Sequence, residues 1–368
     1  MKTICIPIVN RTNYTKMKPL MLKLKQSGKV NLDVIVSSSM VLDKYASAYK
    51  DIESDGFEIK GKFNCLVEGD SHESMVQTAA MSMIHHSNFF KENKPDLLLV
   101  VGDRFDMFPI VLSASYMNID IAHIQGGEIS SSIDDTIRNM ISLSSSLHFT
   151  ATELSKKRVT LLGCTNVWNY GCPAVEYITS LNIGDKFDFK YLHKTFKHKI
   201  DIEDDEKYII TLLHPDTKNP SDVDMDIVLK VLKKTGVKCF VFYPNPDACN
   251  SRITQSINKY KTYENFYFIK HIPIEGYIHL LAHASCMVSN SSSGIREAAS
   301  FGTPVINVGN RQLGREKNES TFNCSCNFDD MLTLIDFCMN KGFDKDNKYY
   351  KENCTENIYN KILEYLGE

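Results

Sequence analysis

The chain has 368 residues, of which 43% are hydrophobic and 24% charged, and its formal net charge is −3. This is the composition of an ordinary globular protein, long enough for two domains with separate cores. The nearly balanced charge gives no electrostatic reason to expect nucleic acid or an acidic membrane as a partner, and no apolar run approaches the roughly 20 residues of a membrane span.

The cysteines and histidines give no sign of a metal site. The eleven cysteines are scattered, and the closest pair, Cys324 and Cys326, lacks the spacing typical of zinc ligands. His85 and His86 are adjacent in a predicted helix and therefore do not share a face.

The N-terminal run 3–9 is not a signal-peptide core. We expect free thiols, no metal and a cytoplasmic protein.

Apolar runs alternate with helix-like segments through the first half of the chain. The predicted strands are 4–9, 32–37, 95–101, 119–124 and 147–150, and the predicted helices are 17–26, 71–92, 108–117, 133–143 and 152–162. This alternation predicts a doubly wound parallel sheet. Ligands of such a sheet collect at the carboxyl ends of its strands.

Polar and titratable residues follow several of these strands. Arg11 follows the strand at 4–9, and Asp103 and Arg104 follow the strand at 95–101. His123, Gln125 and Glu128 stand at the end of the strand at 119–124, and Asp134, Asp135 and Arg138 lie in the helix at 133–143. Neighbouring carboxylates shift one another's pKa values, which commonly separates an acid from a base in one pocket. A structural reading remains open. In it Asp134 and Asp135 cap their helix, Asp103 pairs with Arg104, and Arg11 is solvated.

The alternation restarts after residues 182–207, a charged, turn-rich segment that we take as the connection to a second domain. Predicted strands at 208–213, 239–243 and 266–269 and helices at 224–235 and 277–284 follow, and a last helix is predicted at 349–366. His214 stands at the end of a strand, where a histidine is either structural or part of a site. No Gly-x-Gly-x-x-Gly or Walker sequence occurs, which argues against a dinucleotide oxidoreductase or a P-loop ATPase.

A serine-rich turn at the end of another apolar run is a candidate phosphate site. The run 286–288 leads into Ser289-Asn-Ser-Ser-Ser-Gly294, before a predicted helix at 295–300 and a strand at 305–308. Backbone N–H groups at a helix start bind anions, and hydroxyls add donors. The candidate residues are Ser291, Ser292, Ser293 and Gly294, with Arg311 and Arg315 beyond the second strand. The plainer alternative is an N-capped helix with surface arginines.

A series of motifs along the chain resembles the hydrolysing UDP-N-acetylglucosamine 2-epimerases. They are Asn10-Arg-Thr-Asn-Tyr14, Gly102-Asp-Arg-Phe-Asp106, His123-Ile-Gln-Gly-Gly-Glu128, Ile133-Asp-Asp-Thr-Ile-Arg138, Leu213-His-Pro215, Ser289-Asn-Ser-Ser-Ser-Gly-Ile-Arg-Glu297 and Arg311-Gln-Leu-Gly-Arg-Glu316. The resemblance covers nearly the whole chain. It is closest to the epimerase half of the bifunctional epimerase and N-acetylmannosamine kinase of sialic acid synthesis.

The resemblance implies a GT-B fold, with two Rossmann-like domains facing a central cleft. Domain boundaries would be 1–180, completed by a helix at 349–368, and 181–348. It implies conversion of UDP-N-acetylglucosamine and water into N-acetylmannosamine and UDP through a glycal, without a cofactor. It further implies a homodimer or a homotetramer.

The resemblance also implies roles for individual residues. Ser291, Ser292 and Arg311 would hold the diphosphate, with Arg11 nearby, and Glu297 would bind the ribose; Asp103, Asp134 and His214 would be acid, base or sugar-orienting groups. Two positions depart from the family pattern. Gln125 stands where members often carry Glu, and Asn139 where they commonly carry His, so Glu128 or Asp135 would have to compensate.

Other activities stay open at this point. The same chemistry on GDP-N-acetylglucosamine or on a UDP-linked 2,4-diacetamido-trideoxy sugar fits the same motifs. A GT-B glycosyltransferase or an inactive nucleotide-sugar binder is also compatible, because Gln125 and Asn139 remove two candidate proton carriers.

Overall fold

The computed structural model describes residues 1–43, 47–69, 71–130, 132–184, 189, 200, 202–203, 206–216, 219, 221–245, 247–270 and 272–368. The chain divides into two compact units. The first comprises Met1–Ile129, Ile133–Tyr177 and Tyr349–Glu368, and the second comprises Ser130–Ser132 and Ile178–Lys348. The C-terminal segment thus returns to the unit in which the chain begins.

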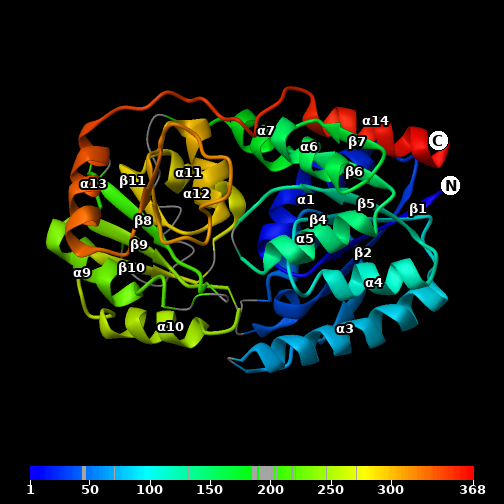
Figure 1. Cartoon of the computed structure of the whole chain (residues 1–368), viewed down its shortest axis with the longest axis horizontal. Helices are drawn as coiled ribbons and strands as arrows, with labels where there is room; N and C mark the ends of the chain where they lie inside the picture. The colour runs from blue at the N-terminus through cyan, green and yellow to red at the C-terminus, as the bar shows by residue number, and fades with distance from the viewer. Residues whose placement is uncertain are drawn as a thin grey trace. The chain divides into compact units, whose positions relative to one another are not determined.

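The first unit is built on a parallel sheet with the strand order β3-β2-β1-β4-β5-β6-β7 (Figure 1). Its strands are β1 Thr3–Ile8, β2 Asn31–Ser37, β3 Ile59–Phe63, β4 Leu97–Val101, β5 Asp120–Ile124, β6 Leu147–Thr150 and β7 Val167–Asn169. Its helices are α1 Arg11–Ser27, η1 Ser38–Val41, α2 Tyr49–Ser54, α3 His72–Glu92, α4 Phe108–Tyr116, α5 Asp134–Leu143, α6 Glu153–Leu161 and α14 Cys354–Leu366, and α7 Pro173–Ser180 spans the boundary.

Helices cover both faces of this sheet because its central strands are apolar on both sides. In β4, Leu97 and Leu99 belong to a core that also contains residues of α1 and α14. Leu98 and Val100 alternate with them and belong to a second core with residues of α3, α4 and α5. Strands buried on both faces are typical of parallel sheets. The prediction of a doubly wound sheet is therefore confirmed.

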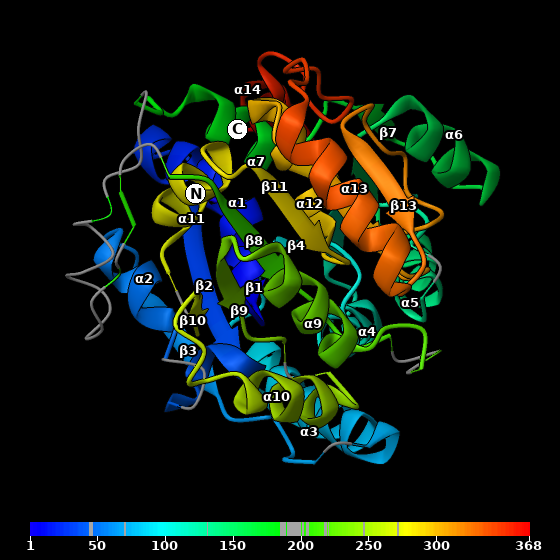
Figure 2. The same cartoon turned by 90° about the vertical axis from the view of Figure 1, so that its left-hand side faces the viewer.

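The second unit repeats this design with a parallel sheet of order β10-β9-β8-β11-β12-β13. Its elements are β8 Tyr208–Leu212, α9 Met225–Thr235, β9 Lys238–Phe242, α10 Asn250–Lys259, β10 Phe266–Ile269, α11 Ile274–Ala282, β11 Cys286–Ser289, α12 Ser292–Arg296, η3 Ala298–Phe301, β12 Val305–Val308, β13 Thr321–Cys324 and α13 Phe328–Asn340. Helices α9, α10 and α13 are drawn with this sheet in Figure 2. Apolar residues of these three helices form one core with residues of the strands. Helix α12 packs so tightly on the sheet that a Cβ at Gly294 would lie 2.9 Å from Val305.

Two helix starts differ from the sequence prediction, and side-chain caps explain both. The first helix was predicted at 17–26, but α1 already begins at Arg11, since the Asn10 side chain accepts the Asn13 N–H at 2.9 Å. The last helix begins at Cys354 rather than at residue 349. The Glu176 carboxylate accepts the Cys354 N–H at 2.7 Å, and so fixes that start from a distant part of the chain.

The helix predicted at 295–300 was also misplaced. Helix α12 begins at Ser292 and ends at Arg296, where the chain passes into a 3-10 turn. The Asn318 side chain donates to the Ile295 carbonyl at 2.8 Å and satisfies a carbonyl left open at this helix end.

Several elements were not predicted at all, namely β3, β7, β13, α2, α7, α10 and α13. The predicted connection at 182–207 lies mostly outside the described residues. Among the described residues, no helix combines the length and the apolar composition needed to cross a bilayer.

All eleven cysteines lie in the described part of the chain and are free thiols. Burial raises the pKa of the Cys65 and Cys338 thiols to about 11. A thiol that ionises so poorly is a weak nucleophile and a weak metal ligand. These two cysteines therefore act as small apolar side chains.

His86 is a buried core residue of α3. Its Nδ1 lies 2.7 Å from the Ser82 carbonyl oxygen, and its ring packs edge-on against Phe63 with 4.9 Å between the ring centroids. Burial lowers the pKa of His86 from 6.5 to about 4. The unfolded chain therefore binds a proton at this residue over a pH range in which the folded chain does not.

The first prediction follows from this difference. Between pH 7 and pH 4.5, His86 should lower the free energy of unfolding by about 2–3 kcal/mol, because protonation favours the unfolded chain as the pH falls below 6.5. The variant His86→Leu should flatten this acid dependence in urea unfolding, whereas His85→Leu should retain the wild-type slope. Equal slopes in both variants would rule out His86 as the source.

Candidate functional site

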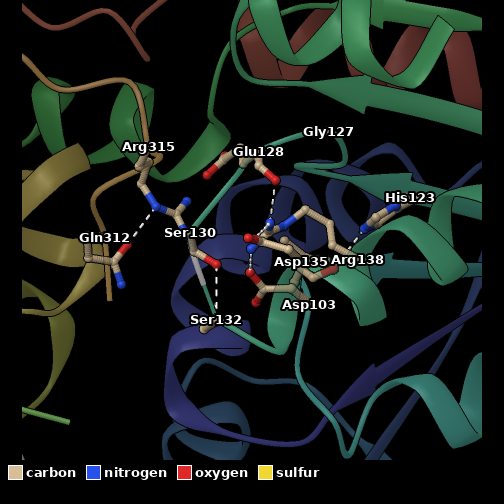
Figure 3. A network of polar contacts seen from close by, with 12 residues as sticks. Asp103, His123, Gly127, Glu128, Ser130, Ser132, Asp135, Arg138, Gln312 and Arg315 are labelled. Carbon is tan, nitrogen blue, oxygen red and sulfur yellow. Dashed lines mark hydrogen bonds and ion pairs between the residues drawn. The ribbon is translucent and has the colours of Figure 1, made fainter. Parts of the chain in front are cut away.

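Arg138 of α5 organises a polar cluster at the carboxyl ends of β4 and β5 (Figure 3). Its guanidinium is completely buried and donates to the Asp103 carboxylate and to the Glu128 carbonyl. A further bond joins Nη1 to Asp135 Oδ1 at 2.7 Å. Three segments that are separate in the sequence thus converge on one side chain.

Opposing electrostatic effects act on this guanidinium. Burial by itself lowers the pKa of Arg138, but the carboxylates of Asp103 and Asp135 outweigh it and raise the pKa above its ordinary value. A buried arginine is stable only when carboxylates and carbonyls satisfy its donors. The cluster is therefore a fixed ion-paired frame.

His123 links this frame to the sheet. Its Nε2 lies 2.8 Å from the carbonyl oxygen of Gly102, which is the residue before Asp103 in the chain. Its Nδ1 lies 3.0 Å from Ser142 Oγ. A neutral ring that donates from Nε2 and accepts at Nδ1 satisfies both contacts. Burial lowers the pKa of His123 to about 3. Although His123 is a candidate acid or base from its sequence position, its contacts are those of a neutral brace.

The turn after β5 is tightly constrained. Gln125 adopts a positive φ of 66°, and a Cβ at Gly127 would lie 2.2 Å from the Ser155 carbonyl oxygen, so only glycine fits there. Gln125 is fully buried, and its Nε2 donates to Cys172 Sγ at 3.0 Å. No described residue donates a hydrogen bond to its Oε1. Glu128 ends the turn and is also buried.

The acidic residues have structural contacts, but not all of those that the structural alternative in the sequence analysis predicted. Asp134 and Asp135 do not cap α5, whose N-cap is Ile133 without a side-chain cap bond. Asp103 is ion-paired with Arg138. Arg104 in turn places Nε 3.1 Å from Asp106 Oδ1.

The remaining candidates of the first unit are partly buried. Asp134 opens α5 and Asn139 lies within it. Arg11 is the first residue of α1, and burial lowers its pKa while Asp51 opposes the shift.

In the second unit, the serines after β11 bond largely to the protein itself. Ser291 accepts the Ser293 N–H at 3.3 Å, and its own N–H donates to Ser289 Oγ at 2.9 Å. Ser293 Oγ lies 2.6 Å from the hydroxyl of Tyr277. Ser292 and Gly294 are in the short helix α12, and Glu297 follows it and is buried. Five residues of helix contribute only a weak dipole, so an anion here depends more on neighbouring cations.

Both candidate arginines lie in the loop after β12. Arg311 Nη1 donates to the Asn290 carbonyl at 3.0 Å, and the buried Arg315 donates from Nε to Gln312 Oε1 at 2.7 Å (Figure 3). His214 follows β8, and its Nδ1 accepts the Asn245 N–H at 3.2 Å.

Some residues of these networks were missed from the sequence. Asn290 stands inside the serine motif and Gln312 beside Arg311, so their motif positions were an available signal. Ser142 and Tyr277 offered none, since both lie outside the motifs.

Within the described residues, no group of three or more histidine, cysteine, aspartate or glutamate side chains has the geometry to hold a metal ion.

Two parallel α/β domains, each with its polar residues at the carboxyl ends of its strands, define a protein of the GT-B class. Residues 22–363 match the model of one family of that class, described as UDP-N-acetylglucosamine 2-epimerase. The chain belongs to this family.

Curated relatives and solved structures agree with this assignment. The chain is 27% identical over 360 residues to a hydrolysing UDP-N,N'-diacetylbacillosamine 2-epimerase of Legionella pneumophila, covering 97% of this chain and 94% of the relative. It is 30% identical over 334 residues to a hydrolysing GDP/UDP-N,N'-diacetylbacillosamine 2-epimerase of Campylobacter jejuni, covering 89% and 85%. The UDP-GlcNAc 2-epimerase of Neisseria meningitidis bound to UDP-GlcNAc has the same fold, with a TM-score of 0.78, 17% identity and coverage of 99% and 100%.

The second prediction tests the ion-paired frame. Replacing Arg138 with alanine leaves the carboxylates of Asp103 and Asp135 without this partner, and should lower the free energy of unfolding by about 3–5 kcal/mol. Urea unfolding measures this loss. Arg158→Ala removes a partly buried arginine that bonds only weakly to the Gly127 carbonyl, and should cost no more than about 1 kcal/mol. Similar losses in the two variants would mean that Arg138 does not hold the cluster.

Proposed function

We propose that the chain is a hydrolysing 2-epimerase that converts UDP-N-acetylglucosamine and water into N-acetylmannosamine and UDP. The substrate in this proposal is supported by the family model, which is described as UDP-N-acetylglucosamine 2-epimerase and matches residues 22–363. The hydrolysing reaction is supported by two curated relatives, both named as hydrolysing 2-epimerases, which match along 97% and 89% of the chain. In this reaction a base removes the C2 proton as UDP leaves C1, and water and a proton then add to the resulting glycal.

The first unit is the proposed site of the sugar chemistry. Asp103 and Asp135 are held by Arg138, and an ion-paired carboxylate accepts hydrogen bonds and protons but donates none. Asp134 is partly buried at the start of the same helix. We assign proton transfer or sugar orientation to Asp103 and Asp134, with Glu128 and Asp135 as further candidates.

The amide of Gln125 cannot titrate near neutral pH, and its contact with Cys172 Sγ points to a structural role. Asn139 likewise carries no proton at neutral pH. The proton transfers are therefore assigned to the carboxylates named above and to His214.

The second unit is the proposed site of the diphosphate. A departing UDP carries increasing negative charge, so groups that hold it strengthen their contacts in the transition state. We assign this role to Arg311, Ser291 and Ser292, with Arg315 of the same unit and Arg11 and Arg104 of the first unit as further cationic candidates and Glu297 as the ribose ligand. Arg138, a further candidate from the sequence, is not assigned to the diphosphate because its guanidinium is completely buried and ion-paired with Asp103 and Asp135.

A second candidate substrate is UDP-N,N'-diacetylbacillosamine. Both relatives described above are named for this sugar. It keeps the acetamido group at C2 and the UDP at C1, so the same residues would serve both substrates.

The third prediction decides between these activities. In D2O, proton NMR should show UDP and a 2-epimerised sugar that carries deuterium at C2, because the proton returns to C2 from solvent. The two nucleotide sugars should be compared at equal concentration, and the larger kcat/KM identifies the substrate. UDP released with an unlabelled, unepimerised sugar would show a simple hydrolase, and no turnover without an acceptor would favour a glycosyltransferase or an inactive binder.

The fourth prediction concerns the division of labour between the units. Arg311→Ala should weaken UDP binding by at least about tenfold, because a charge-assisted hydrogen bond to the diphosphate is lost. Asp134→Asn should leave UDP affinity within a few-fold but lower turnover by about 10²-fold, the scale of losing an acid or a base. Isothermal titration with UDP and single-turnover kinetics measure the two effects. Loss of UDP binding in Asp134→Asn to the same degree as in Arg311→Ala would contradict this division.

A further inference from the structure

Asn290 occupies a central position in the second unit and has no role in the assignments made so far. It follows β11 directly and is fully buried. Its Oδ1 accepts the His214 N–H at 2.7 Å, and its Nδ2 donates to the His214 carbonyl at 2.8 Å. One amide therefore satisfies both backbone groups of His214, beyond the point where the ladder between β8 and β11 ends.

The backbone carbonyl of Asn290 holds the other side of the network. It accepts Arg311 Nη1 at 3.0 Å and Gln312 Nε2 at 3.1 Å. Gln312 Oε1 in turn accepts Arg315 Nε at 2.7 Å. Both arginines after β12 are thus connected to the end of β8 through one residue.

The ring of His214 is fixed separately from its backbone. The Asn245 N–H donates to its Nδ1, which must then carry a lone pair, so a neutral ring carries its proton on Nε2. With its backbone held by Asn290 and its ring by Asn245, His214 is set in one orientation and one tautomer.

We propose that Asn290 is a positioning residue. It fixes the position of His214 relative to the loop that carries Arg311 and Arg315, and it does not itself contact substrate. The inference rests on the proposed function. Removing the amide takes away both of these hydrogen bonds to the backbone of His214, and the loss of hydrogen bonds inside a protein is costly. The end of β11 would shift to relieve this cost, and the carbonyl that holds Arg311 would move with it.

A matched control exists in the same unit. Asn318 is also a buried asparagine whose amide makes two backbone bonds, from Nδ2 to the Ile295 carbonyl at 2.8 Å and from the Lys348 N–H to Oδ1 at 2.9 Å. Asn318 lies further along the same loop between β12 and β13 as the two arginines, but its amide bonds go to the carbonyl end of α12 and to Lys348, and not to His214, Arg311 or Arg315. Asn318→Ala therefore removes a buried amide but keeps the bonds from Asn290 to His214 and to Arg311.

The experiment compares Asn290→Ala with Asn318→Ala for thermal stability, UDP affinity by isothermal titration, and turnover. Both variants should lose stability to a similar extent. Asn290→Ala should weaken UDP binding by at least about tenfold and lower kcat by about 10²-fold, whereas Asn318→Ala should change either quantity by less than about threefold.

A double-mutant cycle on UDP binding distinguishes an effect of Asn290 that acts through Arg311 from a general loss of stability. If Asn290 acts on UDP through the arginine, adding Asn290→Ala to Arg311→Ala should weaken UDP binding by less than about a further threefold. Fully additive losses would overturn the proposal, as would equal UDP affinities and turnover in the two asparagine variants.

If Asn290→Ala does not fold, Gln312→Ala tests the network from its other side, because it removes the bonds from Gln312 to the Asn290 carbonyl and to Arg315 while keeping Asn290. UDP affinity should then fall by at least about threefold, and an unchanged affinity would overturn the proposal. Failure of the proposed function is recognised separately: the wild type would then bind UDP without releasing an epimerised sugar, and the UDP affinities would still decide the role of Asn290.

Discussion

The candidate site of the first unit depends on the ion pairs and hydrogen bonds of one buried group, the guanidinium of Arg138. Taking a charge of this kind out of water costs several kcal/mol, and the cost is recovered only through well-placed partners. Here the partners are Asp103 from the end of β4, Asp135 from α5 and the Glu128 carbonyl from the turn after β5. Each of these segments is held near the others because the charge would otherwise be unpaired.

The turn after β5, whose Glu128 carbonyl accepts a hydrogen bond from Arg138, is also constrained by its own backbone and its neighbours. Gly127 must be a glycine because its Cβ would overlap the Ser155 carbonyl, and Gln125 must accept a left-handed backbone. Strained backbone of this kind persists where the surroundings determine it, and it is frequent at functional sites. The neutral His123 adds a brace from β5 to the residue before Asp103. The acidic residues of the site are thereby placed by side chains that do not themselves need to change protonation.

The sequence predicted the sheets and the positions of the polar residues well, but not their partners. Buried strands such as β4 are unmistakable apolar runs, and the residues that follow them must lie at one edge of a parallel sheet. The partner of Asp103 was beyond this reasoning, because the adjacent Arg104 is as plausible in sequence as the distant Arg138. The start of α14 was missed for a similar reason: it is set by Glu176, far away along the chain. Short strands such as β3 and β7 carry too few apolar residues for a periodic signal.

The two units use different means to hold charge, and this difference bears on mechanism. In the first unit the cation is internal, so its carboxylates are fixed before any ligand arrives. In the second, Arg311 is only partly buried and donates to a backbone carbonyl, which is a weaker partner for a cation than a carboxylate. An anion that reaches Arg311 therefore need not displace a carboxylate at this contact. Under the proposed function, the fixed carboxylates of the first unit would serve proton transfer, which needs constant geometry, and Arg311 would stabilise the departing diphosphate as its charge grows.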